Sequence, residues 1–292
     1  MDRWLLTAIG LLLSGPLKAQ PLTWSIPAAL GTVVRESGVY PATPDYVLIQ
    51  DVHSHGDVQT QIADLLRYAR TRWGVDKAFI EGAFSPVAKH DIPAAFLDPE
   101  AWRLLAKNGE LSGPELALLE APAAFQLIGV DDPALYRDDV VAYEQLRQWR
   151  AQILRNRPTL SPSEKSLFSH LLSLQMTAGD VTAYKTSKPL SRLSDSWARA
   201  AHTAEHFYAA ADQRSAAFLA NAEAVPTRGP HVLITGGYHT EALCAALKAA
   251  GKSFMVIRPT VTRGGFEATY QDHLRQTARL LQPHTVVAST SF

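Results

Sequence analysis

Hydrophobic residues occur in short continuous runs separated by polar turns. The clearest runs cover residues 46–49, 78–80, 125–130, 231–234 and 253–257, in which Gln126, His231 and Ser253 are the polar residues. An unbroken apolar run of this length, bounded by turn residues, is typical of a strand that is covered on both faces. The pattern therefore predicts five buried strands of a mainly parallel sheet.

The segment after the first run has the period of a helix. Its apolar positions, Val58, Ile62, Leu65 and Leu66, recur at the spacing of one helical face. Asp57 is placed to cap this helix, which should end at Gly74. Together with the runs at 46–49 and 78–80, the helix predicts a βαβ unit.

A second βαβ unit is predicted near the end of the chain. The run at 231–234 leads to a helix that Thr240 could cap, and the run at 253–257 follows. VLIQDVH in the first unit and VLITGGYH in the second are nearly the same strand and turn, with one inserted residue. We therefore expect an α/β fold whose sheet is built from two pseudo-repeated halves.

The middle of the chain, about 139–225, is mostly helical and is predicted to be an insertion that caps this core. A closing helix at 271–281 and an edge strand at 285–287 are expected after the second unit. Residues 20–292 then form a single domain.

The N-terminus has the features of a secretory signal peptide. Arg3 precedes a short apolar stretch, Gly15 and Pro16 break it, and Ala19 offers a cleavage point. The stretch is shorter than the roughly 20 apolar residues that span a bilayer. We expect residues 1–19 to be removed and the chain to be exported, periplasmic or secreted, with no stable membrane insertion afterwards. The only cysteine, Cys244, is expected to be a buried thiol.

Charge narrows the range of partners. The chain has 28 Lys and Arg residues and 28 Asp and Glu residues, so its formal net charge is zero. Nucleic-acid binding needs a basic excess to neutralise phosphates. We therefore expect a small-molecule or peptide substrate and no nucleic acid.

Ionisable and glycine residues follow the predicted strands. In an open parallel sheet the carboxyl ends of the strands share one edge, where ligands bind. The residues at these ends are Asp51, His53 and His55, then Glu81, then Asp131 and Asp132, then Gly236, Gly237, Tyr238 and His239, and finally Arg258. This convergence predicts a functional cleft.

Histidines and carboxylates together suit two chemistries. His53, His239 and Glu81 could ligate a divalent metal such as Mn, Co or Zn that activates water. Alternatively, the histidines act directly as general base and acid, with Asp51 and Glu81 as their partners. Gly236 and Gly237 let the backbone approach a substrate, and Arg258 could neutralise a carboxylate or an oxyanion.

These residues resemble the erythromycin esterase/ChaN/TraB–TIKI superfamily, over roughly residues 45–260. The family's Gly-Glu-x-His turn is similar to Gln50-Asp51-Val52-His53, and its Glu after the next strand to Glu81. Its Gly-x-Asp is similar to Gly129-Val130-Asp131, its helical arginine to Arg214, and its final Gly-x-x-His to Gly236–His239. The chain differs at Gln50 and Asp51, where the family usually has Gly and Glu.

The resemblance implies a duplicated α/β core and three activities. Esterase members are hydrolases with histidine bases and no metal, TIKI-like members are metal-dependent proteases, and ChaN-like members bind haem iron. It also implies that Arg214 holds an anionic group and that Asp131 and Tyr238 contribute to the substrate cleft. The sequence leads to the hypothesis of an exported ester or peptide hydrolase. A haem or iron carrier with Tyr238 or a histidine as ligand is the alternative, and an inactive scaffold is a third.

One competing motif lies in the helical middle. His202-Thr203-Ala204-Glu205-His206 matches the H-x-x-E-H pattern of inverted zinc peptidases. Two histidines one helical turn apart could face one zinc ion. No second motif supports this pattern, so an amphipathic helix with a polar face is the preferred interpretation.

Overall fold

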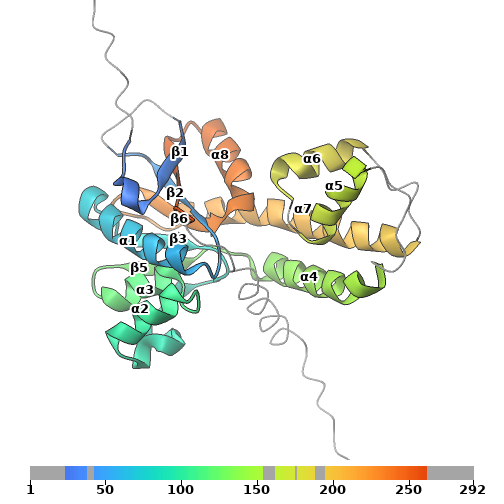
Figure 1. Cartoon of the computed structure of the whole chain (residues 1–292). Helices are drawn as coiled ribbons and strands as arrows, with labels where there is room; N and C mark the ends of the chain where they lie inside the picture. The colour runs from blue at the N-terminus through green and yellow to red at the C-terminus, as the bar shows by residue number, and fades with distance from the viewer. Residues whose placement is uncertain (1–23, 38–42, 154–161, 175, 188–194, 262–292) are drawn as a thin grey trace, which may run out of the picture.

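The computed structural model describes residues 24–37, 43–153, 162–174, 176–187 and 195–261. The expected signal peptide, the helix at 271–281 and the strand at 285–287 lie outside these residues. The described chain has an α/β fold in which a sheet is covered by helices on both faces and a helical insertion extends to one side (Figure 1).

Seven strands form one mixed sheet in the described part of the chain, in the order β1-β7-β2-β6-β3-β5-β4. The five central strands are parallel, and they correspond to the five apolar runs: β7 (Phe254–Arg258), β2 (Tyr46–Asp51), β6 (His231–Gly236), β3 (Lys77–Ile80) and β5 (Gln126–Gly129). Two antiparallel edge strands, β1 (Thr32–Ser37) and β4 (Pro86–Val87), were not expected from the pattern.

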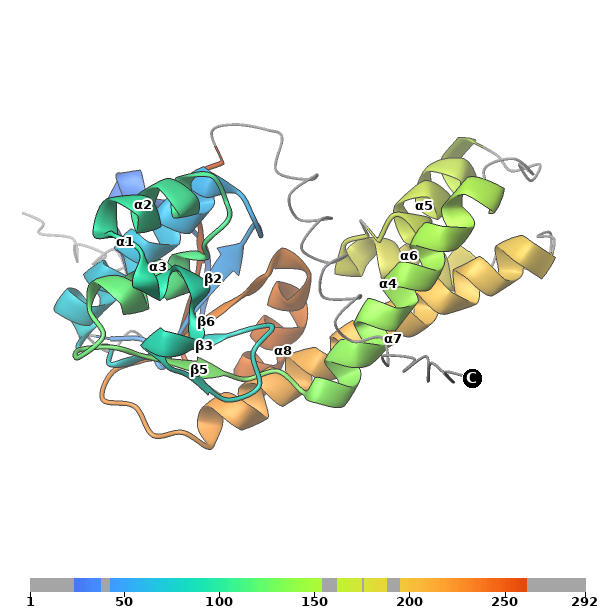
Figure 2. The same ribbon diagram turned by 90° about the horizontal axis from the view of Figure 1, so that it is seen from below.

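Alternate residues of each central strand contribute to two different cores. Val47 and Ile49 of β2 pack under α1 (Gly56–Trp73), α2 (Pro99–Lys107) and α3 (Gly113–Glu120). Tyr46 and Leu48 pack on the other face against α8 (Thr240–Ala249) and the end of α7 (Asp195–Glu223). Figure 2 shows these helices on opposite sides of the sheet.

Cys244 belongs to the second of these cores. It is buried and unpaired, and burial raises the pKa of its thiol. A raised pKa keeps the sulfur protonated and poorly nucleophilic.

The helical insertion consists of α4 (Pro133–Ile153), α5 (Pro162–Leu172), α6 (Ala178–Ser187) and α7. Only its base covers the sheet, where Phe218 and Ala222 of α7 are fully buried against it. The other end has an apolar cluster of its own around Phe168, Trp197 and Tyr208 and projects away from the sheet (Figures 1 and 2).

Short 3-10 helices complete the connections: η1 (Ala28–Leu30), η2 (Lys89–Asp91), η3 (Pro93–Phe96) and η5 (Gly237–His239). Two helix starts differ from the prediction. Helix α1 begins at Gly56 with His55 as its N-cap, so Asp57 lies within the first turn, where a negative charge favours the helix dipole. Helix α8 begins at Thr240 itself, after His239.

No described helix, including the long α4 and α7, carries an apolar stretch sufficient to cross a membrane.

Candidate functional site

Neighbouring strands bring the predicted residues to one edge of the sheet. Strands β2 and β6 pair in parallel with Asp51 opposite Gly236. Strand β3 lies on the other side of β6, and the Glu81 N–H donates to Ile234 O at 3.2 Å. The ends of three adjacent strands therefore place Asp51, Gly236 and Glu81 next to one another.

The first part of the site is a histidine–carboxylate pair. His53 Nδ1 lies 2.5 Å from Asp51 Oδ2, and Gln59 Nε2 donates to Asp51 Oδ1 at 2.7 Å. Burial acts to lower the pKa of His53, but the charge and hydrogen bond of Asp51, assisted by Glu81, outweigh it and raise this pKa to about 9. His53 is therefore positively charged at neutral pH.

The turn that carries His53 is tightly held. Ser54 has a φ of 60°, which is unusual for a residue with a side chain. A Cβ on Gly109 would lie 1.9 Å from Ser54 O, and a Cβ on Gly56 would lie 1.7 Å from Lys107 O. These contacts leave no space for larger residues, so the loop after α2 fixes the backbone around His53.

Glu81 forms the second histidine–carboxylate pair. Its Oε1 accepts from Arg214 at 2.9 Å and lies 3.4 Å from His239 Nε2. Its Oε2 accepts from the Gly236 N–H at 2.7 Å. Burial acts to raise the pKa of Glu81, but His239, Arg214 and His53 together hold it well below its usual range. On the far side of the imidazole ring, His239 Nδ1 lies 2.8 Å from Ser215 Oγ.

The Arg214 guanidinium joins three carboxylates. Besides Glu81, it donates to both oxygens of Asp131, at 3.0 and 2.6 Å, and to Asp139 at 2.5 Å. Four of its five N–H groups are used in this way, and the Arg214 side chain is 6% exposed. The expected role of Arg214 in holding a substrate anion is therefore revised: it holds Glu81 in place.

The role expected for Asp131 changes for the same reason. Its side chain is fully buried, and its oxygens also accept from the Gly82 and Asp132 N–H groups. A carboxylate enclosed in this way supports the site and does not contact a substrate.

Asp139 and Ser215 were not predicted from the sequence, and both come from the base of the insertion. Burial raises the pKa of Asp139 to about 6 against the opposing effect of Arg214. Asp139 Oδ1 is buried and has no hydrogen-bond partner among the described residues. The insertion thus contributes a carboxyl group that protonates more easily than a solvated one.

The two pairs meet at Gly236. A Cβ built on this residue would lie 3.5 Å from His53 Nε2, 3.5 Å from Glu81 Oε2 and 4.0 Å from His239 Cδ2. The missing side chain leaves a space the size of a methyl group, in contact distance of both imidazoles. This space, bounded by His53, Glu81 and His239, is the candidate site.

Three further predicted residues lie at its periphery. Gly237 is exposed with open space around it, and Arg258 is exposed at the end of β7. The Tyr238 hydroxyl donates to Asp212 at 2.9 Å, and burial together with Asp212 raises the pKa of Tyr238. Iron is bound by the phenolate form of tyrosine, so this arrangement does not favour Tyr238 as a haem ligand.

The expected metal site does not match the arrangement of these side chains. Within the described ranges, no group of three His, Cys, Asp or Glu residues is placed to hold a metal ion. The Glu81 carboxylate already contacts Arg214, the Gly236 N–H and His239, and His53 Nδ1 already contacts Asp51. His53, His239 and Glu81 are therefore arranged as histidine–carboxylate pairs.

The H-x-x-E-H pattern in α7 has a structural explanation. Glu205 accepts from the Tyr184 hydroxyl at 2.8 Å, and its other oxygen lies 3.0 Å from His202 Nδ1. The Glu205 carboxylate thus links α7 to α6 within the insertion.

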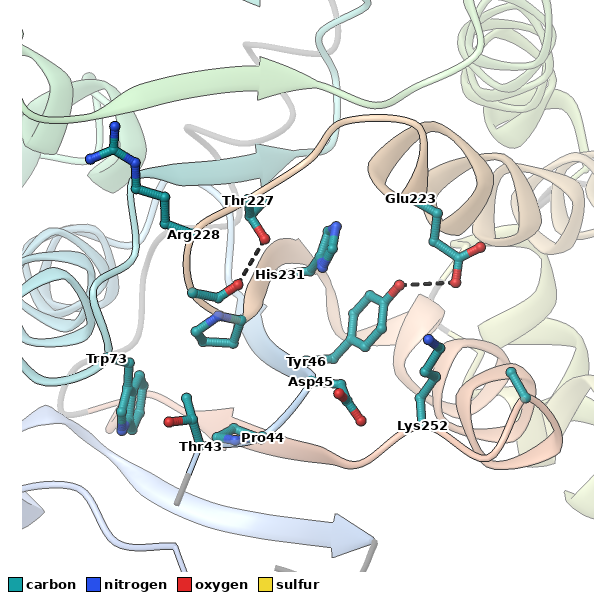
Figure 3. Close-up of a pocket in the computed structure, with 13 residues that line it drawn as sticks. Thr43, Pro44, Asp45, Tyr46, Trp73, Glu223, Thr227, Arg228, His231 and Lys252 are labelled. Atoms are coloured by element: carbon teal, nitrogen blue, oxygen red, sulfur yellow. Dashed lines mark hydrogen bonds between the residues drawn. The ribbon is translucent and has the colours of Figure 1, made fainter. Parts of the chain in front are cut away.

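A pocket of about 730 Å³ opens at the opposite edge of the sheet, among the first residues of β2 and β6 (Figure 3). Its carboxylates have partners within the protein: Tyr46 donates to Glu223 at 3.0 Å, and Ser253 Oγ lies 2.6 Å from Asp45 Oδ2. Because the pocket is at the amino ends of the strands, it contributes nothing to the candidate site.

Comparisons of the chain with protein-family models, with curated proteins and with solved structures found no match. The resemblance to the erythromycin esterase/ChaN/TraB–TIKI superfamily therefore rests on the motifs alone.

Proposed function

We propose that the protein is a hydrolase that cleaves an ester or peptide bond in a small-molecule or peptide substrate, with His53 as general base. The observation that carries this proposal is the meeting of two histidine–carboxylate pairs around the bare Cα of Gly236. An imidazole held by a carboxylate at Nδ1 can accept a proton at Nε2, and the carboxylate stabilises the imidazolium that forms.

In the proposed reaction, neutral His53 removes a proton from a water molecule as the water oxygen bonds to the substrate carbonyl carbon. Collapse of the tetrahedral intermediate breaks the carbon–oxygen or carbon–nitrogen bond, and the leaving group receives a proton. The proton that His53 took from water returns to the leaving group. His239, whose ring nitrogens face Glu81 and Ser215, holds Glu81 beside Gly236. Arg258, exposed at the end of the neighbouring β7, would attract an anionic part of the substrate.

The test is hydrolysis of chromogenic esters and short peptides by the purified protein. His53→Ala should lower kcat/KM by at least about 100-fold, which is the lower range for a lost acid or base. His239→Ala should lower it as well, because Glu81 then loses a partner beside Gly236. His170→Ala, an exposed histidine on α5, is the matched control and should keep its activity. Equal activity in all three variants would overturn the proposal.

The same preparation tests the carrier function. If the wild type hydrolyses no substrate but gives a Soret shift with added haem, and Tyr238→Phe loses this shift, the protein is a haem-binding protein and not a hydrolase. Bound Mn, Co, Zn and Fe are measured in the same preparation. If the wild type binds one of these metals stoichiometrically and His53→Ala does not, the reaction is metal-assisted and the metal-free proposal is wrong.

We further propose that the chain is exported, on the evidence of residues 1–19. The mass of the mature protein tests this, since cleavage after Ala19 should leave Gln20 as the first residue. A product that stays in the cytoplasm and retains residues 1–19 would contradict it.

A further inference from the structure

Gln59 is a polar residue in an otherwise apolar part of α1. It lies among Val58, Ile62 and Ala63 in the layer between the helix and the sheet, and it is 1% exposed. A buried amide is costly unless its donors and acceptor have partners. The partners of Gln59 therefore indicate why a glutamine occupies this position.

The amide connects a helix terminus to the Asp51–His53 pair. Gln59 Oε1 accepts from the Gly113 N–H at 2.7 Å, and Gln59 Nε2 donates to Asp51 Oδ1 at 2.7 Å and to Val52 O at 3.2 Å. Gly113 is the first residue of α3, and its N–H has no acceptor within that helix. One side chain thus satisfies this N–H and holds one oxygen of Asp51.

The orientation of the amide follows from its partners. A backbone N–H can only donate, so the Gln59 oxygen must face Gly113 and the nitrogen must face Asp51. The anchor at α3 is rigid, because a Cβ on Gly113 would lie 2.3 Å from Gln59 O and 2.7 Å from Ile62 Cβ. Ser112 also caps this helix by accepting from the Glu115 N–H at 3.3 Å.

From this geometry we infer that Gln59 is a positioning residue for the reaction: it fixes the Asp51 carboxylate so that Oδ2 meets His53 Nδ1. The inference rests on the proposed function for its effect on catalysis. Gln59 does not contact the space at Gly236 and acts through Asp51, so losing it should lower kcat more than it changes KM.

Two substitutions separate this role from simple packing. Gln59→Met has a similar length but no donor, so Asp51 Oδ1 loses its anchor. In Gln59→Glu, a protonated carboxyl can accept from Gly113 and donate to Asp51, as the amide does. Once that proton is lost, two carboxylates face each other at the 2.7 Å that now separates Gln59 Nε2 from Asp51 Oδ1.

The experiment measures kcat and KM from pH 6 to pH 10. Gln59→Met should lose about 10- to 100-fold in kcat at every pH, as expected for a displaced catalytic group. The kcat of Gln59→Glu should resemble that of the wild type at low pH and decrease at high pH. Its pH profile should therefore be bell-shaped, whereas the wild-type profile rises. Gln61→Met, on the same helix but bonded to Thr260, is the control and should follow the wild type.

A second readout does not need a substrate. In protein labelled with ¹⁵N-histidine, the Nδ1–H of His53 bonded to Asp51 should give a far-downfield proton signal that is absent in His53→Ala. Gln59→Met should lose this signal, and Gln59→Glu should keep it only at low pH. Thermal unfolding confirms that each variant is folded.

The inference is overturned if Gln59→Glu follows the wild-type pH profile, or if Gln59→Met keeps both its kcat and the His53 signal. If the wild-type protein hydrolyses nothing, the proposed function fails, and the His53 signal alone decides the role of Gln59.

Discussion

Replacing Asp51 by asparagine removes a charge from the site with almost no change in shape. In the wild type, the pKa of His53 is raised to about 9 from an ordinary 6.5. With a pKa near 9, roughly one His53 in 100 is neutral at pH 7, so a general base should give a rate that rises about tenfold per pH unit up to about pH 9. Asp51→Asn leaves burial as the main influence, so the midpoint of the profile should fall to about 6.5 or lower.

The rate itself should fall because of Gln59. Gln59 Nε2 can only donate, so the side chain introduced by Asp51→Asn must turn its oxygen towards Gln59 and its amide nitrogen towards His53. His53 Nδ1 then has to accept, which places the proton on Nε2 and leaves no lone pair for water. A wrong tautomer of this kind costs about 10⁴-fold in kcat in the serine protease triad.

The assay is kcat/KM from pH 5 to pH 10.5 for the wild type, Asp51→Asn and Asp64→Asn. Asp64 lies on α1 in an exposed ion pair with Arg67 and is the control. If Asp51 contributed only charge, Asp51→Asn would be up to about 100-fold faster at pH 7, because most His53 would be neutral. A faster variant would refute the orienting role of Asp51, and a midpoint that stays near pH 9 would refute its charge as the cause of the raised pKa of His53.

Two further predictions concern the other half of the site. Arg214→Met leaves Glu81, Asp131 and Asp139 without their shared cation, so the free energy of unfolding in urea should fall by about 3–5 kcal/mol. Arg199→Met, on the exposed side of α7, should change the free energy of unfolding by less than about 0.5 kcal/mol. A similar loss in the two variants would argue against a stabilising role of Arg214 among its three carboxylates. Gly236→Ala places a methyl group 3.5 Å from His53 Nε2 and Glu81 Oε2 at a φ of −54°, so the protein should fold normally but lose about tenfold or more in kcat/KM. Gly237→Ala has open space and should remain active, and full activity in Gly236→Ala would place the substrate elsewhere.

The central strands could be predicted because burial on both faces leaves an unbroken apolar run. The edge strands could not. Strand β1 contains Arg35 and Glu36 and has no buried residue, and β4 has only two residues, one of them Pro86. Charged residues and proline are common at sheet edges, where they prevent further pairing, and they also remove the apolar signal that prediction needs.

The site was predictable where it depends on strand ends and not where it depends on helix packing. Asp51, Glu81 and His239 follow buried strands, so the topology alone places them together. Asp139 and Ser215 lie in helices of the insertion, and only the packing of these helices brings Asp139 to Arg214 and Ser215 to His239. The sequence gives only a weak indication of the role of Gln59: a glutamine within an apolar helical face must have buried hydrogen-bond partners, but the sequence does not name them.

Arg214 illustrates why residue type alone misassigns a role. An arginine near a predicted cleft suggests a substrate anion, yet here the anions are the protein's own. Glu81, Asp131 and Asp139 carry up to three negative charges in a buried region, and Arg214 is the cation that lets them remain there. The number of acidic residues around an arginine depends on tertiary contacts and not on local sequence.

The two histidine–carboxylate pairs differ in what compensates their negative charge, and this difference assigns their roles. Asp51 receives a neutral amide from Gln59, so His53 is its main source of positive charge and binds a proton firmly. Glu81 is kept ionised by several partners, because Arg214 and the Gly236 N–H add to the effect of His239. Groups whose surroundings differ in this way take different parts in proton transfer. The pair that holds its proton through a single strong partner, Asp51–His53, is the one whose protonation should control the pH profile.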